Sequence, residues 1–391
     1  MKLEKPNSSR IGTVLHFTPS VGGGGAEAML CNLVKAMHGG PWRNVVVAVK
    51  TGTNGCQAAR MREVADAFYD LDSNSLLRPA LFKRLRAIIQ LEKPDIVQTW
   101  MHHADFVGGL AARLSGVKHV VWGIHSRSIF RWPGDSDLKF SLFQAAIRAA
   151  SLAVPQRIVS CSETAIADHA SMGFPRRKMA FIANGICTHR FQPSVEAGVK
   201  TRLLLGIPLD APVVGFVGRF HPVKNLSLFF RAAADLQRRM PEAHFILSGG
   251  SPMTLDEKAR PAYDALPDRT AVHFVPFNSS PEMLYPAFSV FSLCSESEAL
   301  PMTILEAMAC GVPCVATDVG DCANVIADTG LAVPLGDPSA LANGWSKMLN
   351  ADSALRNTLS QRARERIVSQ FSITHAAAQY ESTYRSLIET V

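Results

Sequence analysis

Short runs of apolar residues alternate with stretches of helical periodicity along most of the chain. The apolar runs have the length of buried strands and form two series. The first comprises residues 13–17, 45–49, 95–100, 119–124, 157–161 and 180–182, and the second 213–217, 243–247, 272–275, 290–293, 314–317 and 331–333. Helical spacing occurs between them, as at residues 26–37, 81–91, 226–238 and 303–309. This alternation is typical of parallel sheets covered by helices, so we predict an α/β protein with doubly wound sheets.

The transition between the two series of strands predicts the domain organisation. Gln192 and Pro193 follow the last strand of the first series, and a new series begins soon after them. A chain of 391 residues also suits two domains better than a single core. We therefore expect a first domain over residues 1–192 and a second over residues 193–372.

The last segment of the chain, residues 373–391, has a helical pattern of its own. Tyr380, Tyr384 and Leu387 lie on one face of this predicted helix. Because a helix with one apolar face needs a surface to cover, we expect the segment to pack back on the first domain.

Hydropathy argues against a membrane-spanning protein. No apolar stretch is long enough to cross a bilayer without a charge, and the best candidate, residues 140–155, contains Arg148 and is interpreted as an amphipathic helix. Residues 1–10 lack the apolar core of a signal peptide. The eight cysteines form no Cys-x-x-Cys pair, which favours buried thiols in a reducing compartment. We expect a cytoplasmic protein.

The net charge of +7 is unevenly distributed along the chain. Residues 1–192 contain 24 Lys and Arg against 13 Asp and Glu, a net charge of +11, whereas residues 193–391 contain 16 against 20, a net charge of −4. A basic half favours an anionic partner such as lipid headgroups or nucleic acid. Because aromatic and basic residues do not interleave in a known binding motif, we expect no nucleic acid.

A basic helical stretch at residues 78–93 is the candidate for membrane contact. Lys83, Arg84 and Arg86 lie beside an apolar stripe in this stretch. Such a pattern is typical of helices on anionic membrane surfaces, but for this stretch we favour an ordinary sheet-covering helix with solvated cations. The net charge of +11 over residues 1–192 is the stronger reason to expect peripheral contact with the inner face of the plasma membrane.

The loops that follow strands carry the candidate chemistry, because ligands of open parallel sheets bind beyond the carboxyl ends of the strands. After strand 213–217 come a glycine turn, Arg219, Lys224 and Asn225, and Asn225 is a good helix N-cap. Two cations beside the positive end of a helix suit a diphosphate. Two solvated surface cations are the alternative.

Two carboxylates follow strand 290–293. Glu298 lies in the loop, and Glu306 lies within a helix that begins near Pro301 and ends near Gly311. Paired carboxylates also occur in glycosidases, but a helix N-terminus between them and nearby cations favour an anionic leaving group. A capping acid and a solvated helix acid are the structural alternative.

A glycine-rich turn, residues 22–25, follows the first strand and opens the first helix. Bare backbone of this kind can approach a phosphate closely, which makes Gly24 and Gly25 candidates for phosphate contact. Glu27 stands where a dinucleotide fingerprint requires glycine, and no acid closes the second strand. An NAD enzyme is therefore disfavoured.

Together these motifs resemble the donor site of the retaining GT-B glycosyltransferases of family 4. The resemblance rests on Arg219, Lys224 and Asn225, on the Glu298-x7-Glu306 spacing before Gly311-Val312-Pro313, and on the turns at Gly24–Glu27 and Asn184–Ile186. The matching spacing covers almost the whole chain. It implies two facing Rossmann-like domains with a cleft between them, an acceptor domain first and a nucleotide-sugar donor domain second.

The resemblance also implies a role for each charged candidate. Arg219 and Lys224 would neutralise the donor diphosphate, Glu298 would hold hydroxyls of the transferred sugar, and Glu306 would hold the ribose. His125, which closes strand 119–124, would face the donor sugar from the first domain. A structural histidine is the alternative for His125.

Uncharged candidates complete the implied donor site. The backbone at Leu300, Pro301, Met302 and Thr303 would face the phosphates or the sugar, and Phe277 would contact the nucleobase. Cations and a helix N-terminus would stabilise the departing phosphate, which could then deprotonate the acceptor hydroxyl on the same face. Cys294 stands where the family commonly has proline, a departure that leaves the charges of the implied site intact.

No metal ion and no other cofactor is expected. The Asp-x-Asp patterns of metal-dependent transferases occur at Asp135–Asp137 and Asp70–Asp72. The first lies in a loop with Pro133 and Gly134 that no apolar strand precedes, and the pattern is short enough to arise by chance. We interpret both as loop acids.

The expected function is transfer of a hexosyl or N-acetylhexosaminyl group from a nucleotide diphosphate, with UDP favoured, to a hydroxyl acceptor. The acceptor is expected to be a saccharide or a lipid-linked intermediate of envelope polysaccharide or lipopolysaccharide biosynthesis. A sugar-nucleotide epimerase of similar architecture and a catalytically silent partner subunit are the alternatives.

Overall fold

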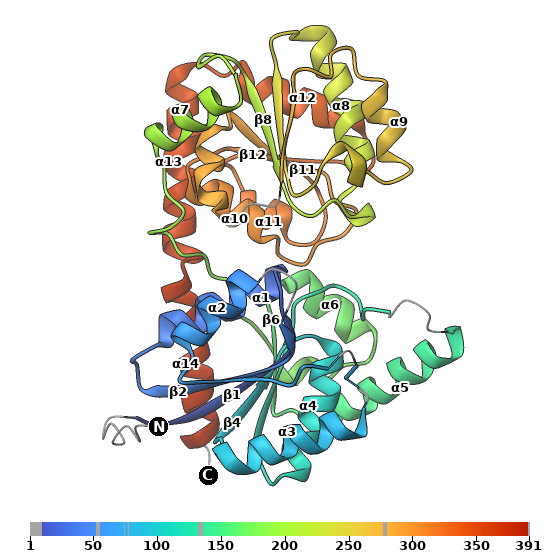
Figure 1. Ribbon diagram of the computed structural model, residues 1–391, viewed down its shortest axis with the longest axis vertical. Helices are drawn as coiled ribbons and strands as arrows, with labels where there is room; N and C mark the ends of the chain where they lie inside the picture. The colour runs from blue at the N-terminus through green and yellow to red at the C-terminus, as the bar shows by residue number, and fades with distance from the viewer. Residues whose placement is uncertain are drawn as a thin grey trace. The chain divides into compact units, whose positions relative to one another are not determined.

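The computed structural model describes residues 10–51, 55–73, 75–76, 78–131, 136–276 and 280–389 (Figure 1). The described chain forms two compact units, one that runs to Gly185 and resumes at Ile373, and one from Ile186 to Ser372. Each unit contains one parallel sheet packed against helices, which confirms the predicted α/β class. Among the described residues, no helix combines the length and apolarity needed to span a bilayer.

The first unit has a parallel sheet with the order β3-β2-β1-β4-β5-β6-β7. Its strands are β1 (Gly12–Val21), β2 (Trp42–Thr51), β3 (Ala67–Asp70), β4 (Ile96–Thr99), β5 (His119–Ile124), β6 (Arg157–Ser160) and β7 (Met179–Phe181). Its helices are α1 (Gly25–Met37), α2 (Gly55–Val64), α3 (Pro79–Glu92), α4 (His102–Leu114), α5 (Asp137–Ala153), α6 (Glu163–Ser171), the short 3-10 helix η1 (Arg176–Lys178) and α14 (Ile373–Glu389). In register, Val14 of β1 lies between Asn44 of β2 and Ile96 of β4.

The C-terminal helix α14 completes the core of the first unit. Tyr380 and Tyr384 are fully buried. The ring of Tyr384 lies edge-on to Trp42 with centroids 5.7 Å apart, and Tyr380 stacks near Trp100 at 6.1 Å. These aromatic contacts attach the last segment of the chain to β2 and to the residue that follows β4, and they bury large side chains in this core.

The boundary between the units lies at Gly185 and not after residue 192. The Ile186 amide donates to the Phe371 carbonyl at 2.9 Å, and Ile186 pairs with Ser372 in an isolated bridge. The Arg364 guanidinium donates to the carbonyls of Thr188 and Phe191. These bonds attach residues 186–192 to the second unit, a long-range link that local turn residues do not reveal.

The second unit has a parallel sheet with the order β10-β9-β8-β11-β12-β13. Its strands are β8 (Val213–Val217), β9 (His244–Ser248), β10 (Val272–Val275), β11 (Val290–Leu293), β12 (Cys314–Thr317) and β13 (Leu331–Val333). Its helices are α7 (Val195–Leu204), α8 (Leu226–Arg239), α9 (Ala259–Asp264), α10 (Met302–Ala309), α11 (Cys322–Ile326), α12 (Pro338–Leu349) and α13 (Ser353–Gln370). Short 3-10 helices are η2 (Pro222–Lys224), η3 (Pro252–Thr254), η4 (Pro281–Met283) and η5 (Tyr285–Ala287).

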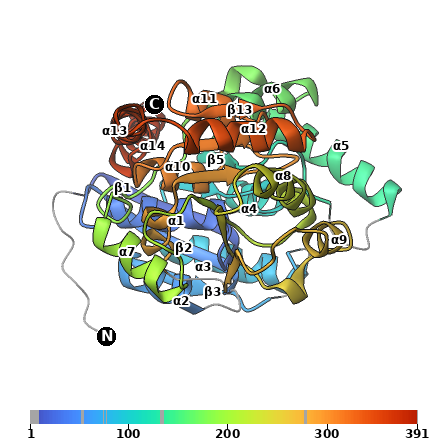
Figure 2. The same ribbon diagram turned by 90° about the horizontal axis from the view of Figure 1, so that it is seen from above.

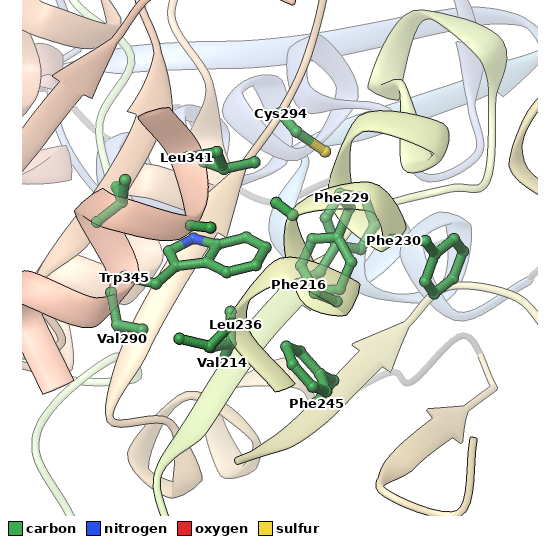
Figure 3. Packing of buried hydrophobic residues seen from close by; sticks show 14 of the residues in the cluster. Val214, Phe216, Phe229, Phe230, Leu236, Phe245, Val290, Cys294, Leu341 and Trp345 are labelled. Atoms are coloured by element: carbon green, nitrogen blue, oxygen red, sulfur yellow. The ribbon is translucent and has the colours of Figure 1, made fainter. Parts of the chain in front are cut away.

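An aromatic cluster between the sheet and two helices forms the core of the second unit (Figure 3). Phe229 of α8 packs against Trp345 of α12 with ring centroids 5.1 Å apart, and Phe216 of β8 lies 6.0 Å from Phe229. All three side chains are fully buried. The cluster holds α8 firmly, and with it the loop from β8 that carries Arg219 and Lys224.

One interpretation of a charged segment needs correction, and another can be compared with the structure. Asp70 is not a loop acid but the last residue of β3, a strand that we did not predict, and its carboxylate accepts bonds from the Thr51 hydroxyl and the Asp72 amide. In α3, Arg84 and Arg86 donate to the carbonyls of Leu71 and Leu114. These cations brace their own unit, so the geometry of α3 matches an ordinary sheet-covering helix.

Candidate functional site

The strand order of the second sheet reverses at β8, which has β9 on one side and β11 on the other. The carboxyl ends of β8 and β11 lie side by side at this reversal, which is where open parallel sheets bind ligands. The predicted cations follow β8 and the predicted carboxylates follow β11. The topology brings the two motifs to one edge of the sheet.

Lys224 and Glu298 form the centre of the candidate site. The Lys224 ammonium contacts Glu298 Oε1 at 2.5 Å, and the Ser295 hydroxyl donates to the same oxygen at 2.7 Å. The two charged side chains are only 22% and 14% exposed, so water screens their attraction weakly. Asn225, in the left-handed region, accepts from the Leu228 amide and caps α8 directly after Lys224.

Cys294 links the two loops that carry this ion pair. Its thiol donates to the Lys224 carbonyl at 3.0 Å, and the Glu296 amide donates to the Val223 carbonyl at 2.8 Å. Burial raises the pKa of Cys294 to about 12, so the sulfur stays protonated and can donate. A proline, which the family commonly has at this position, would lack this donor. The cysteine in this chain therefore adds a hydrogen bond between the two loops.

Helix α10 starts beside Glu298 with amide groups that no side chain caps. Pro301 occupies the N-cap position and has no side-chain oxygen, so the first N–H groups of Met302 and Thr303 lack an intrahelical or capping partner. The Thr303 hydroxyl is buried and has no hydrogen-bond partner among the described residues. Leu300 and Pro301 are themselves buried and hold the turn in place. Unpaired donors at a positive helix end suit an anionic ligand.

Arg219 is not brought to Glu298. Its side chain is exposed and forms no hydrogen bond or ion pair with other described residues. Of the two predicted cations, only Lys224 contacts Glu298, while Arg219 extends from the same loop without an ion pair to this carboxylate.

Gly249 and Gly250, directly after β9, were missed as part of this site. Gly249 has φ +130°, and a Cβ atom there would overlap the Gly218 carbonyl group next to Arg219. A Cβ atom at Gly250 would overlap the ring of Phe220. Two successive glycines at the end of an apolar strand were a visible signal for a close backbone approach.

We expect Gly249→Ala to displace the Arg219 loop, lower the free energy of unfolding by about 2 kcal/mol or more, and weaken donor binding. Gly206→Ala is the matched control, because Gly206 has φ +67° and a Cβ atom added there would meet nothing within 4 Å. The control should cost about 1 kcal/mol from backbone strain alone and leave ligand binding unchanged. Urea unfolding and titration calorimetry measure both; equal effects of the two variants on binding would contradict the prediction.

Glu306 lies within α10 and contacts a residue that sequence reasoning did not identify. The buried Tyr285 hydroxyl donates to Glu306 Oε2 at 2.5 Å. Burial raises the pKa of Glu306 to about 7, against the hydrogen bond from Tyr285 and the charge of Arg190, which lower it. No local pattern pairs η5 with α10, so Tyr285 gave no signal in the sequence.

In the first unit, the glycine-rich turn already binds an anion of its own. Glu27 Oε2 accepts hydrogen bonds from the amides of Gly23 and Gly24 at 2.5 and 2.6 Å, and Ser20 donates to Oε1. Burial acts in the opposite direction, but these bonds lower the pKa of Glu27. Gly24 is the N-cap residue of α1 and Gly25 its first residue. Glu27 at the third helical position was a signal for this internal cap.

His125 follows β5 in the first unit and stacks on Trp100, with ring centroids 4.8 Å apart and an interplanar angle of 16°. Burial lowers its pKa to about 4, and the nearby Asn184 side chain acts in the opposite direction. Neither ring nitrogen of His125 has a hydrogen-bond partner among the described residues. A neutral imidazole at pH 7 can orient a hydroxyl but does not carry a charge to a phosphate. Sequence analysis did not identify Trp100 as the residue that supports the His125 ring, because a tryptophan at the end of a strand usually indicates a core residue.

Two further candidates, Phe277 and Asp135, lie outside the described residues. Asp137 opens α5 and pairs with Arg131 at 2.8 Å. Within the described part of the chain, no three His, Cys, Asp or Glu side chains are grouped as metal ligands.

Comparison with known proteins agrees with this arrangement. Residues 211–351 match the model for glycosyl transferases group 1, and residues 23–190 match the model for glycosyltransferase family 4. EpsF of Bacillus subtilis (strain 168), named as a glycosyltransferase, is 29% identical over 315 residues, which cover 78% of this chain and 79% of EpsF.

Two further similarities extend over most of the chain. The UDP-Gal:alpha-D-GlcNAc-diphosphoundecaprenol alpha-1,3-galactosyltransferase of Escherichia coli is 24% identical over 330 residues, 79% of this chain and 81% of that protein. The crystal structure of Anabaena Alr3699/HepE in complex with UDP-glucose superposes with a TM-score of 0.82 at 20% identity, over 96% of this chain and all of the other. The architecture is thus the GT-B fold, and the chain belongs to the group 1 glycosyltransferases of family 4.

Proposed function

We propose that this glycosyltransferase moves a hexosyl or N-acetylhexosaminyl group from a UDP-sugar to a hydroxyl of a lipid-linked acceptor, with retention of anomeric configuration. The observation that carries the proposal is the convergence of Lys224, Ser295 and Glu298 beside the uncapped start of α10. The Escherichia coli relative is named for a UDP-sugar and a diphosphoundecaprenol-linked acceptor, and the Anabaena structure holds UDP-glucose. These names support UDP and a lipid-linked acceptor for this chain.

In this proposal the ammonium of Lys224 serves the leaving group and the sugar together. An ammonium has three donors, and Glu298 occupies one of them, so two remain for diphosphate oxygens. Glu298 Oε2 is then available for hydroxyls of the transferred sugar. Arg219, exposed on the same loop, would fold onto the diphosphate when the donor binds.

In the proposed reaction, the bond from the anomeric carbon to the phosphate oxygen breaks and its electron pair stays on the phosphate. Lys224 and the first amides of α10 stabilise this charge where it develops. The acceptor hydroxyl bonds to the anomeric carbon on the same face, and its proton passes to the departing phosphate. Glu306 would hold the ribose, and the neutral His125 would orient the donor sugar.

Thermal unfolding with added nucleotides tests the choice of donor. At a hundred times its dissociation constant, UDP or a UDP-sugar should stabilise the protein by about 2.7 kcal/mol, while GDP and ADP should give much smaller shifts. Equal or larger shifts with GDP would contradict the assignment of UDP. No shift with any common sugar nucleotide would favour the catalytically silent subunit.

Product analysis tests the reaction itself. Proton NMR of the product from a UDP-sugar and a polyprenyl-diphosphate-linked sugar should show the anomeric configuration of the donor, and EDTA should leave the rate unchanged. Dependence on added Mn²⁺ would contradict metal-free transfer. Release of a free sugar or an epimer from the donor alone would favour the epimerase.

A further inference from the structure

Helix α5 presents an apolar stripe to solvent. Leu138, Leu142, Ala145, Ala149 and Leu152 recur at the spacing of one helical face, and all five are exposed. Leu138 is 70% exposed, Leu142 62% and Leu152 54%. We call these five residues the α5 stripe.

The α5 stripe is not the face by which the helix packs on its own unit. That role belongs to the opposite face, where Ile147 and Ser151 are buried and Phe143 stacks on His103 with centroids 4.5 Å apart. A surface helix of a globular domain normally turns polar residues outward. Because α5 is apolar on two faces, its outward leucines gain free energy only when something covers them.

Cations border the α5 stripe on both sides. Lys139 and Arg148 flank it on the helix surface, and both are exposed. The neighbouring η1 adds the exposed Arg176 and Arg177, and it is attached to α5 because the Lys178 ammonium donates to the Leu152 carbonyl at 2.6 Å. The only carboxylate within α5, Asp137, is paired with Arg131.

We infer that the α5 stripe docks the first unit on an anionic lipid surface. An apolar face bordered by Lys and Arg is the pattern of helices that lie in the membrane interface, with leucines among the acyl chains and cations at the headgroups. A second copy of the chain fits less well, because a two-fold contact would place these cations against their own copies. Figures 1 and 2 both show α5 extending away from the sheet of its unit, so the helix can lie flat on a surface. The inference rests on the proposed function only in that a lipid-linked acceptor gives the docking a purpose.

Vesicle sedimentation of the full chain tests this inference. The wild type should bind vesicles of phosphatidylcholine mixed with phosphatidylglycerol, and it should bind far less to pure phosphatidylcholine. The triple variant Leu138→Gln/Leu142→Gln/Leu152→Gln should lower the partition coefficient at least about tenfold, because three side chains no longer leave water for the acyl region. Lys139→Glu should lower binding to the mixed vesicles about fivefold or more, since each cation near the surface contributes substantially.

A matched control uses three exposed leucines of the second unit. Leu203→Gln/Leu204→Gln/Leu209→Gln removes side chains that are 64%, 77% and 53% exposed, and it should leave vesicle binding at the wild-type value. Equal losses in the two triple variants would overturn the inference, as would a wild type that binds neither kind of vesicle. A lipid-free dimer that the α5 variant converts to monomer would instead identify a second copy as the occupant and overturn it too.

Failure of the docking is separable from failure of the proposed function. The α5 triple variant should keep the wild-type dissociation constant for UDP, because its substitutions lie in the first unit and outside the donor loops. If the protein binds anionic vesicles through the α5 stripe but binds no nucleotide, the docking inference stands and the proposed reaction is wrong.

Discussion

Lys224→Ala should lower kcat/KM for sugar transfer about a thousandfold or more and abolish measurable binding of UDP. The physical reason is the role of its ammonium, which in our proposal meets the charge that develops on the departing phosphate in a partly buried setting. Removal of one preorganised group of this kind costs about 10²–10³ in rate, and loss of a full positive charge adds to that. Initial-rate kinetics and titration calorimetry with UDP measure the two effects.

Two variants separate this role from a purely structural one. Lys347→Ala changes a lysine in the last turn of α12, away from the donor loops, and should retain wild-type kinetics. Lys224→Arg keeps the charge and should retain more activity than Lys224→Ala, although its planar fork cannot reproduce the contact with Glu298. A Lys224→Ala protein that unfolds at the wild-type temperature and keeps a tenth of the wild-type kcat/KM would refute the assigned role.

Glu306→Gln should make the protein more stable above pH 7 while it weakens the binding of UDP. Burial raises the pKa of Glu306 from 4.5 to about 7, so ionisation of this carboxyl costs free energy in the folded state. At pH 8 a neutral, equally large amide avoids about 2–3 kcal/mol of that cost and still accepts the bond from Tyr285. The ribose hydroxyls would lose a charged acceptor, which should raise the dissociation constant of UDP about tenfold.

The sign of the pH dependence follows from the direction of the shift. Between pH 4.5 and about 7 the folded state keeps the Glu306 proton that the unfolded chain has released, so the wild type loses stability as pH rises through this window. The gain from Glu306→Gln should therefore be absent near pH 4.5 and reach its full size above pH 7.

The difference in the free energy of unfolding between the variant and the wild type separates the effect of Glu306 from that of a second buried acid. Burial also raises the pKa of Asp105 to about 7, against hydrogen bonds from Thr99 and Gly123, and Asp105 contributes equally to both proteins. Urea unfolding from pH 5 to pH 8.5 measures the difference. If Glu306→Gln is less stable than the wild type at every pH, ionisation of Glu306 does not cost free energy in the folded state and the prediction is wrong.

The fold class was predictable because each strand is a continuous apolar run. Strands such as β8 and β11 are covered on both faces, so their composition marks them without any knowledge of their neighbours. β3 escaped prediction because all four of its residues are only partly buried at the edge of the sheet, where apolar patterning is weak. The boundary at Gly185 escaped because bonds to Phe371 and Arg364 define it, and those partners are distant in sequence.

For the candidate site, motif spacing identified Lys224 and Glu298 as members of one centre, although 74 residues separate them. Spacing did not show that Cys294 and Ser295 would brace that pair, or that Arg219 would stand apart from it. The roles assigned to Lys224, Glu298, Glu306 and residues 300–303 stay predictions.

The sequence by itself determined which residues lie at the carboxyl ends of the strands, because apolar runs and turn residues are local features. Only the tertiary structure decided which of them meet. Strand order brings the β8 and β11 loops together, burial changes the protonation of Glu306 and His125, and the Gly23 and Gly24 amides turn to Glu27 instead of an outside anion. Contact, burial and charge depend on partners far along the chain, and a linear pattern does not contain them.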